Sequence, residues 1–378
     1  MRIGIFTHNF PRNVNDRQNA GIFVNDIAQE LSRKNKVGVF THDSRLSAGK
    51  IGTVNISYFP WIREKKIGSL KFWNPFDVIS LCFFFINGIG KLRTFIKTNK
   101  IEVCLSMWAF PGGVFSYLCK KIYKIPYAVW CLGSDIYVYS RYPVINYLIK
   151  KILCSADLVF ADGFDLANKV TNISGRKCLF LSSASRVMCP LVPVAKTKSD
   201  KLRLLMVGRM EKIKGPDIML DALFKLGQNI NKYEVHFVGD GSLLEELKKR
   251  VEKSGHKLEI IFHGNINSFK QIGTIMRQSD WLVIPSLSDS IPLVFSEAMK
   301  CSLPVIVSDL SDLKHLVEHH RIGLVFKTGS VNSLASLLGK LPLLMDKRKY
   351  FVNNTSEVAL NFSIEESAKK LSNLLAAI

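Results

Sequence analysis

Two cations follow a strand-like segment in the second half of the chain, at a spacing that suits phosphate binding. The segment at 202–207 ends at Gly208, and Arg209 and Lys214 come next, before Pro216. Glycine lets the backbone turn tightly, and proline favours the first position of a helix. Both cations then project from the carboxyl end of a strand, where open α/β sheets bind ligands. An arginine fork and a lysine point charge suit a diphosphate, although cations in such a loop can also simply be solvated.

A second group of polar sites follows another strand-like segment, about 80 residues further on. Pro292 marks a helix start, so the amides of Leu293 and Val294 lack intrahelical partners and can point at an anion. Glu297 lies one turn beyond Leu293 on the same helix face, where its carboxylate can accept hydrogen bonds from ribose hydroxyls. Asp289, in the loop before the helix, is placed to bind sugar hydroxyls.

Strand-like and helix-like segments alternate from the first residue to about 340, which is typical of parallel sheets with crossover helices. The first half predicts strands at 2–7, 36–41, 101–106, 127–131 and 157–161, and helices at 22–34, 77–98, 112–124 and 141–154. The second half predicts strands at 202–207, 233–238, 258–262, 281–285, 303–307 and 322–326. We therefore expect an α/β fold of two Rossmann-like domains that face each other across a cleft.

The domain boundary is expected where the periodic segments stop. Pro190, Pro193 and a polar run at 196–200 have the composition of a linker. We predict an N-terminal domain at 1–185, a linker at 186–200 and a C-terminal domain at 201–344. The remainder, 345–378, reads as one or two helices that could cross back onto the first domain.

These motifs resemble a known family. An Arg and a Lys five residues apart, and then an acidic residue separated by seven others from a Glu, are similar to the pattern of the retaining family-4 (group 1) glycosyltransferases of GT-B fold. The resemblance is specific across about 202–327 and thinner in the first domain. Further matching segments lie at 238–242, 262–265, 303–309, 19–24 and 133–135.

The resemblance implies that the N-terminal domain, 1–185, binds the acceptor and that the C-terminal domain, 201–344, binds the nucleotide-sugar, and it implies a role for each matching residue. Arg209 and Lys214 would hold the donor diphosphate and neutralise the leaving group, as a metal does in other transferases. Gly208 would form the turn before them, and Gly21 would let a first-domain loop approach the donor closely. The remaining donor contacts would be Glu297 on the ribose, Asp289 on the transferred sugar, and the amides of Leu293 and Val294 on the phosphate.

The implied enzyme retains anomeric configuration and uses neither a metal nor a cofactor besides its nucleotide diphosphate-sugar. No Asp-x-Asp metal motif is present in the sequence. Two positions depart from the family pattern, since the family usually has Glu at Asp289 and His at Leu132. They motivate an alternative, a catalytically inert GT-B protein that binds nucleotide or membrane. Asp135, which follows, has either a functional role or that of a helix cap.

Charge and cysteine usage bound the partners and the compartment. The net charge is +21, and residues 1–185 hold 25 Lys and Arg against 11 Asp and Glu. Such a surface attracts polyanions, but the sequence has no zinc knuckle, RNP motif or helix-turn-helix, which argues against nucleic acid. Eight cysteines without a Cys-x-x-Cys pair fit a reducing compartment, and no signal peptide is evident. We expect a cytoplasmic protein at the inner face of the cell membrane, with a glycan or lipid-linked acceptor.

The apolar run at 78–86 has two interpretations. It is too short to span a bilayer by itself, so it predicts either a buried crossover helix or a monotopic membrane contact. The buried helix is the preferred interpretation, and the surrounding window, 61–100, keeps the second one open because it combines eight Lys and Arg and only two acids with Trp61, Phe72, Trp73 and Phe76.

Overall fold

A computed structural model describes most of the chain and divides it into two compact units. The described residues are 1–12, 21–43, 48–61, 70, 74–184, 186–190, 201–254 and 259–378. One unit comprises Met1–Leu181 and Ile364–Ile378, and the other comprises Ser182–Ser363. Each unit contains its own sheet and its own hydrophobic core.

The first unit is built on a sheet with the strand order β3-β4-β2-β1-β5-β6-β7-β8. Neighbouring strands are parallel except β3, which runs antiparallel to β4 at the edge. Apolar residues fill the central strands because both faces of this sheet are covered by helices. The strands are β1 (Arg2–Phe6), β2 (Lys36–Asp43), β3 (Ala48–Ile51), β4 (Val54–Pro60), β5 (Val103–Met107), β6 (Tyr127–Cys131), β7 (Leu158–Ala161) and β8 (Leu179–Phe180).

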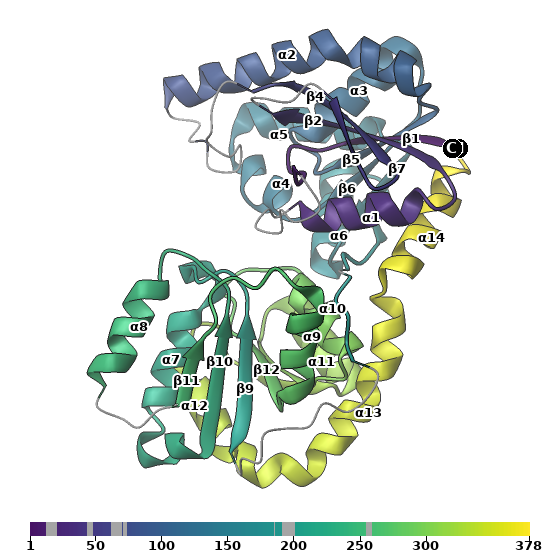
Figure 1. Cartoon of the computed structure of the whole chain (residues 1–378). Coiled ribbons are helices and arrows are strands. Elements are labelled where there is room, and N and C mark those ends of the chain that lie inside the picture. The colour runs from purple at the N-terminus through teal and green to yellow at the C-terminus, as the bar shows by residue number, and fades with distance from the viewer. Residues whose placement is uncertain are drawn as a thin grey trace. The chain divides into compact units, whose positions relative to one another are not determined.

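Helices pack on both faces of this sheet (Figure 1). One face carries α2 (Pro75–Asn99), α3 (Gly112–Tyr123) and α5 (Pro143–Ser155), whose apolar side chains form a common core with Phe6, Phe40 and Phe59 of the strands. On the other face lies α1 (Ile22–Leu31), which packs against the C-terminal helix α14 (Ile364–Leu375). The remaining helices are α4 (Ser134–Tyr137), a short turn at Tyr139–Arg141, and α6 (Phe164–Ser174).

The second unit has an all-parallel sheet with the strand order β11-β10-β9-β12-β13-β14. Its first strand in sequence, β9, therefore lies between β10 and β12, and the chain changes direction across the sheet at this point. Open α/β sheets bind ligands at such a switch point. The strands are β9 (Leu202–Val207), β10 (Tyr233–Val238), β11 (Glu259–Phe262), β12 (Trp281–Ile284), β13 (Val305–Ser308) and β14 (Gly323–Phe326).

Helices again cover this second sheet. Those of this unit are α7 (Pro216–Phe224), α8 (Leu244–Lys253), α9 (Phe269–Gln278), α10 (Leu293–Lys300), α11 (Ser311–His320), α12 (Val331–Lys340) and α13 (Met345–Asn361), with short turns at Lys212–Lys214, Gly227–Lys232 and Leu341–Leu344. The two doubly wound units confirm the α/β fold of two Rossmann-like domains that the sequence predicts.

The compact units do not end where composition changes. Residues 182–184 and 186–190 belong to the second unit, and the rest of the expected linker, 191–200, lies outside the described residues. The helical tail is divided, since α13 belongs to the second unit and α14 to the first. Asn35 donates a hydrogen bond to Ser372 over 3.1 Å, and Lys370 donates one to the carbonyl of Phe180 over 2.8 Å.

Two cysteines behave differently from what the sequence indicates. Cys189 and Cys301 form a disulfide with their Cα atoms 5.3 Å apart, whereas free thiols were expected from a reducing compartment. Cys104 and Cys131 are free and buried in strands, as small apolar residues. The pairing of residues 112 positions apart depends on the fold and has no local sequence signal.

Candidate functional site

The loop after β9 carries both predicted cations. Arg209 is exposed, and Lys212–Lys214 form one turn of 3-10 helix before Gly215 and Pro216. Gly215 has a φ of +69°, and a Cβ there would lie 2.2 Å from the carbonyl oxygen of Pro285. Only glycine fits this position, because the loop passes against the backbone at the end of β12.

The turn after β10 holds this loop from one side. The amide of Met210 donates to the carbonyl of Asp240 over 2.9 Å. The Glu211 carboxylate accepts hydrogen bonds from the amide and the hydroxyl of Ser242, at 3.0 and 2.7 Å. These two bonds lower the pKa of Glu211, so the carboxylate is ionised at neutral pH. Arg209 therefore projects from a turn whose next two residues, Met210 and Glu211, are hydrogen-bonded to the turn after β10.

The segment after β12 holds the same loop from the other side. The amide of Leu287 donates to the carbonyl of Ile213 over 2.8 Å. The ammonium of Lys214 lies 2.6 and 2.9 Å from the two carboxylate oxygens of Asp289. Both side chains are partly buried, with exposed fractions of 21% and 18%. The structure thus brings two predicted site residues, 75 positions apart, into direct contact.

The start of α10 completes the polar edge. Pro292, with extended backbone, is the N-cap, and the amide of Phe295 already bonds to its carbonyl. Leu293 and Val294 occupy the first two helical positions, whose amides have no intrahelical acceptor and lie at the positive end of the helix dipole. Glu297 follows one turn later on the helix. This arrangement can bind an anion beside Lys214 and hydroxyl groups beside Glu297.

The predicted donor-site residues of the second unit thus all lie at the carboxyl edge of its sheet, around the switch point between β9 and β12. They are Gly208, Arg209, Lys214, Asp289, Leu293, Val294 and Glu297. Residues 192–358, which contain this edge, match the model of a family described as glycosyl transferases group 1. This part of the chain therefore belongs to the group 1 glycosyltransferases.

Curated relatives of this glycosyltransferase carry the same general activity in their names. The chain is 25% identical over 285 residues to an uncharacterised glycosyltransferase, MJ1178, of Methanocaldococcus jannaschii, and the match covers 75% of this chain and 77% of that one. It is 26% identical over 231 residues to the O-antigen biosynthesis glycosyltransferase WbnH of Escherichia coli, and this match covers 60% of this chain and 64% of that one.

A solved structure shows the same fold. Anabaena Alr3699/HepE in complex with UDP matches with a TM-score of 0.73 and 16% identity, and the match covers 100% of both chains. At this identity the likeness concerns the fold and leaves the substrate open. Together with the family match, it assigns the two Rossmann-like units of this transferase to the GT-B fold.

Two positions of the first unit that the family resemblance singles out are Gly21 and Leu132, and the structure describes both. A Cβ on Gly21 would lie 2.1 Å from the carbonyl oxygen of Asn9, so close packing requires glycine there. Residues 13–20, and with them the first part of the matching segment 19–24, lie outside the described residues. Leu132, where the family usually has His, is half-buried, and its amide donates to Asp135 over 3.3 Å.

Asp135 holds two strand-end loops together. Its buried carboxylate accepts hydrogen bonds from the amides of Ala109, after β5, and of Leu132 and Ile136, after β6. This is more than the helix cap that the sequence suggests, because Ala109 is 26 positions away. Burial raises the pKa of Asp135 to about 6, although the backbone hydrogen bonds act in the opposite direction.

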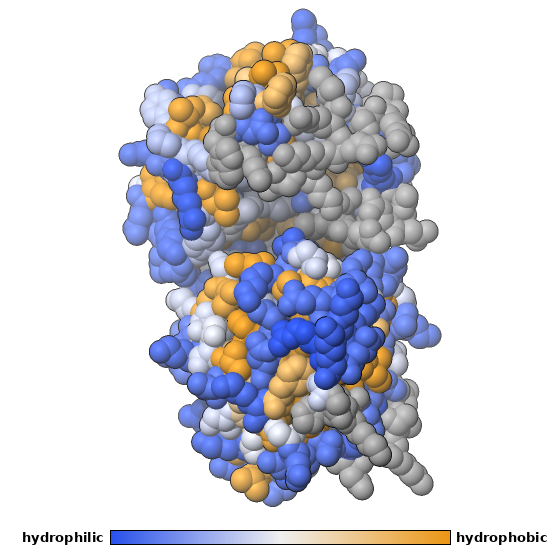
Figure 2. Space-filling model, turned by 90° about the vertical axis from the view of Figure 1, so that its left-hand side faces the viewer, coloured by the Kyte–Doolittle hydropathy of each residue, from blue (hydrophilic) through white to orange (hydrophobic). Residues whose placement is uncertain are grey.

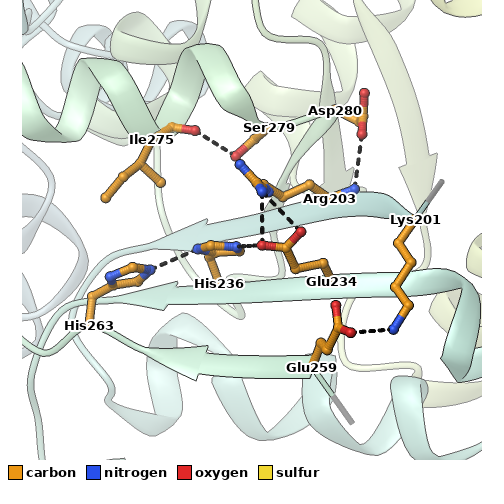
Figure 3. A network of polar contacts seen from close by, with 9 residues as sticks. All are labelled: Lys201, Arg203, Glu234, His236, Glu259, His263, Ile275, Ser279 and Asp280. Carbon is orange, nitrogen blue, oxygen red and sulfur yellow. Dashed lines mark hydrogen bonds and ion pairs between the residues drawn. The ribbon is translucent and has the colours of Figure 1, made fainter. Parts of the chain in front are cut away.

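A polar network inside the second sheet is absent from the sequence predictions (Figure 3). The Arg203 guanidinium lies 2.9 Å from Glu234, whose carboxylate also lies 2.7 Å from Nε2 of His236. Nδ1 of His236 is 2.8 Å from Nε2 of His263, which directly follows β11 at the carboxyl edge. The network thus extends from the interior of the sheet to the edge that carries the candidate site.

The pKa values in this network follow from its burial and pairing. Burial by itself raises the pKa of Glu234, but hydrogen bonds from His236 and Arg203 outweigh it and lower that pKa. Burial lowers the pKa of His236 and of His263, so both imidazoles are neutral at pH 7. Their only sequence signal is a pair of polar residues two apart, at 234 and 236, inside a strand.

We predict that Asp135 makes the stability of this glycosyltransferase depend on pH. Because its folded pKa is about 6 and a free Asp titrates near 4, its contribution to folding is fully present below about pH 4 and lost as the pH rises through 6. The loss amounts to roughly 3 kcal/mol. The Asp135→Asn variant lacks this titration. Urea unfolding followed by tryptophan fluorescence between pH 4 and 7 measures it. A wild-type-minus-variant difference that is constant across this range contradicts the assignment.

Proposed function

We propose that this glycosyltransferase moves a sugar from a nucleoside diphosphate-sugar onto a growing glycan. The observation that carries the proposal is the grouping of Arg209, Lys214 and the start of α10 at one switch point. Two cations and two open amides match the charge and the oxygen count of a diphosphate. The binding of UDP by Alr3699/HepE, and of UDP-glucose by the same protein, supports this choice of donor.

Each residue of the edge has a proposed part in donor binding. Arg209 and Lys214 hold the diphosphate and neutralise the charge that develops as the sugar leaves, and the amides of Leu293 and Val294 bind a phosphate oxygen. Glu297 accepts hydrogen bonds from the ribose hydroxyls. Asp289 contacts the transferred sugar and, through the ion pair observed here, keeps the Lys214 ammonium at the edge before the donor arrives.

We further propose that transfer retains the anomeric configuration and uses no divalent metal. The resemblance to retaining enzymes supports the first point. The second is supported by the two cations and the helix start, which already provide positive charge where the diphosphate is expected. Among the described residues, no three His, Cys, Asp or Glu side chains are grouped around one point as metal ligands.

The acceptor is proposed to be a surface-polysaccharide intermediate, lipid-linked or free, at the cytoplasmic face of the cell membrane. WbnH, a relative by sequence, is named for O-antigen biosynthesis. The excess of 25 Lys and Arg over 11 Asp and Glu in residues 1–185 supports peripheral attachment to anionic lipid.

Replacement of either site cation tests the donor grip. We expect Arg209→Ala and Lys214→Ala each to reduce turnover by roughly a hundredfold, because preorganised charges at a leaving group contribute several kcal/mol. Release of nucleoside diphosphate from a panel of nucleotide-sugars measures this. Lys212→Ala is the matched control, since Lys212 lies in the same turn but pairs with Asp217 and is 73% exposed. Near-normal turnover in both test variants contradicts the assignment.

Chelation tests the proposed independence from metal. Transfer should continue at an unchanged rate in excess EDTA, because protein groups carry the phosphate charge in this proposal. The comparison is the same assay with added magnesium or manganese. Activity that disappears with EDTA and returns with either ion would show that a metal supplies the charge.

The stereochemistry of the product tests retention. The anomeric proton of the first product formed should have the configuration of the donor, because a retaining site holds the leaving diphosphate and the acceptor on the same face of the sugar. Proton NMR of an early reaction mixture measures the coupling constant of that proton. Inversion in the initial product would rule out the retaining assignment while leaving the donor site intact.

A further inference from the structure

Helix α2 buries only one of its faces. Phe84, Leu92 and Phe95 are each 2% exposed or less, and the ring of Phe84 lies 4.9 Å from that of Phe59 in β4. The apolar run at 78–86 is therefore part of a crossover helix of 25 residues that is anchored in the core. The sequence allows either a buried crossover helix or a membrane contact. The first interpretation is correct for the face that carries Phe84, Leu92 and Phe95, but it does not explain the opposite face.

The opposite face of α2 presents large apolar side chains to the surface. These residues recur every three or four positions and so form one stripe along the helix. Their exposed fractions lie between 45% and 69%, far above those of core residues. Apolar residues gather on the side of the first unit toward which α2 extends (Figures 1 and 2). The stripe consists of Phe76, Ile79, Phe83, Ile86 and Ile89.

By length and composition alone, α2 could even cross a membrane, and within the described ranges it is the one helix of which this is true. Its most apolar window has a mean hydropathy of 1.4 and is 28% buried. A spanning position would require Phe84, Leu92 and Phe95 to leave the core, at a cost of about 1.5–3 kcal/mol for each side chain. The fold therefore favours a helix that lies along a surface.

The charge of the same helical layer is positive. Helices α2, α3 and α5, which cover one face of the sheet, contain seven Lys and Arg and a single acid, Asp77, which is buried. Val144 and Tyr147 of α5 add exposed apolar surface, and Lys151 lies 4.6 Å from the Tyr147 ring. The cations are Lys91, Arg93, Lys97, Lys120, Lys121, Lys150 and Lys151.

We propose that this layer docks on an anionic lipid bilayer, with α2 lying in the interface and its stripe inserted among the acyl chains. Apolar side chains next to cations, with no exposed acid on the three helices, match the two layers of a bilayer surface: hydrocarbon beneath anionic headgroups. A protein partner would need an apolar groove of matching shape with acidic groups around it. An anionic bilayer offers negative charge and an apolar interior without requiring a matching shape. The inference narrows the attachment proposed above to one surface and does not depend on the donor site.

Vesicle flotation of the full chain tests the surface. Wild-type protein should float with phosphatidylcholine vesicles that contain phosphatidylglycerol, less with phosphatidylcholine alone, and less at high salt, because exposed charges are screened within about 8 Å at physiological ionic strength. Residues 62–69 and 71–73, which hold further cations and aromatics of the sequence window, lie outside the described residues and are left unchanged.

Paired variants separate the two contributions. Ile79→Ser with Phe83→Ser removes part of the stripe, and Lys91→Glu with Arg93→Glu reverses two charges; each pair should lower partitioning by roughly tenfold or more. The matched controls lie on the second unit, where Leu343→Ser with Leu360→Ser alters exposed apolar residues and Lys249→Glu with Lys253→Glu alters cations. Both control pairs should bind like the wild type.

Two further readouts make the outcome decisive. Alkaline carbonate should release bound wild-type protein, and resistance to it would overturn the surface position in favour of a spanning one. Thermal shift with each of the uridine, guanosine, adenosine, cytidine and thymidine diphosphates should be equal in all variants, which shows that the second unit is intact. Equal flotation of test and control pairs overturns the docking surface while the donor proposal stands. Flotation without any nucleotide effect in the wild type overturns the donor proposal and leaves the docking surface in place.

Discussion

The loop after β9 lies between the turn after β10 and the segment after β12, in close contact with both. Gly215 makes that path available, because any side chain there would collide with the carbonyl of Pro285. Hydrogen bonds from Met210 to Asp240 and from Leu287 to Ile213 then fix the loop on both sides. The positions of Arg209 and Lys214 follow from this constraint, since both belong to a loop that the neighbouring strand ends have already shaped. The site is therefore preorganised by backbone contacts.

The ion pair between Lys214 and Asp289 suits the proposed donor site because the ammonium can exchange one anionic partner for another. Both side chains keep some exposure, and a diphosphate with two charges attracts the ammonium more strongly than a single carboxylate does. The carboxylate holds the long lysine side chain at the edge of the sheet. The shorter Asp, where the family usually has Glu, reaches Lys214 over 2.6 Å and thus performs this task without the extra methylene.

The sequence predicts those features that are local. Alternating apolar segments located both sheets, and the Gly, Pro and cation spacing located the loop after β9 and the start of α10, because backbone turns and helix starts depend on neighbouring residues. Contacts between distant positions were missed. The hairpin of β3 and β4 has mixed polarity, the bond from Ala109 to Asp135 joins two loops, and the network from Arg203 to His263 joins three strands. None of these has a periodicity of its own, since each depends on strand order.

Helix α2 is another case in which the sequence alone does not predict contacts with distant residues, and here the contacts bear on function. A continuous apolar run has no polar side, so the sequence alone cannot tell which of its faces meets the core. The fold decides this through shape, because Gly88 lies where a Cβ would be 2.4 Å from the ring of Phe115, and this contact turns one side of the helix inward. The apolar residues on the other side of the helix do not contribute to the core, so folding does not require them to be apolar. Folding alone does not account for exposed Phe76 and Ile86, at 69% and 63%, whereas a surface that must meet lipid does.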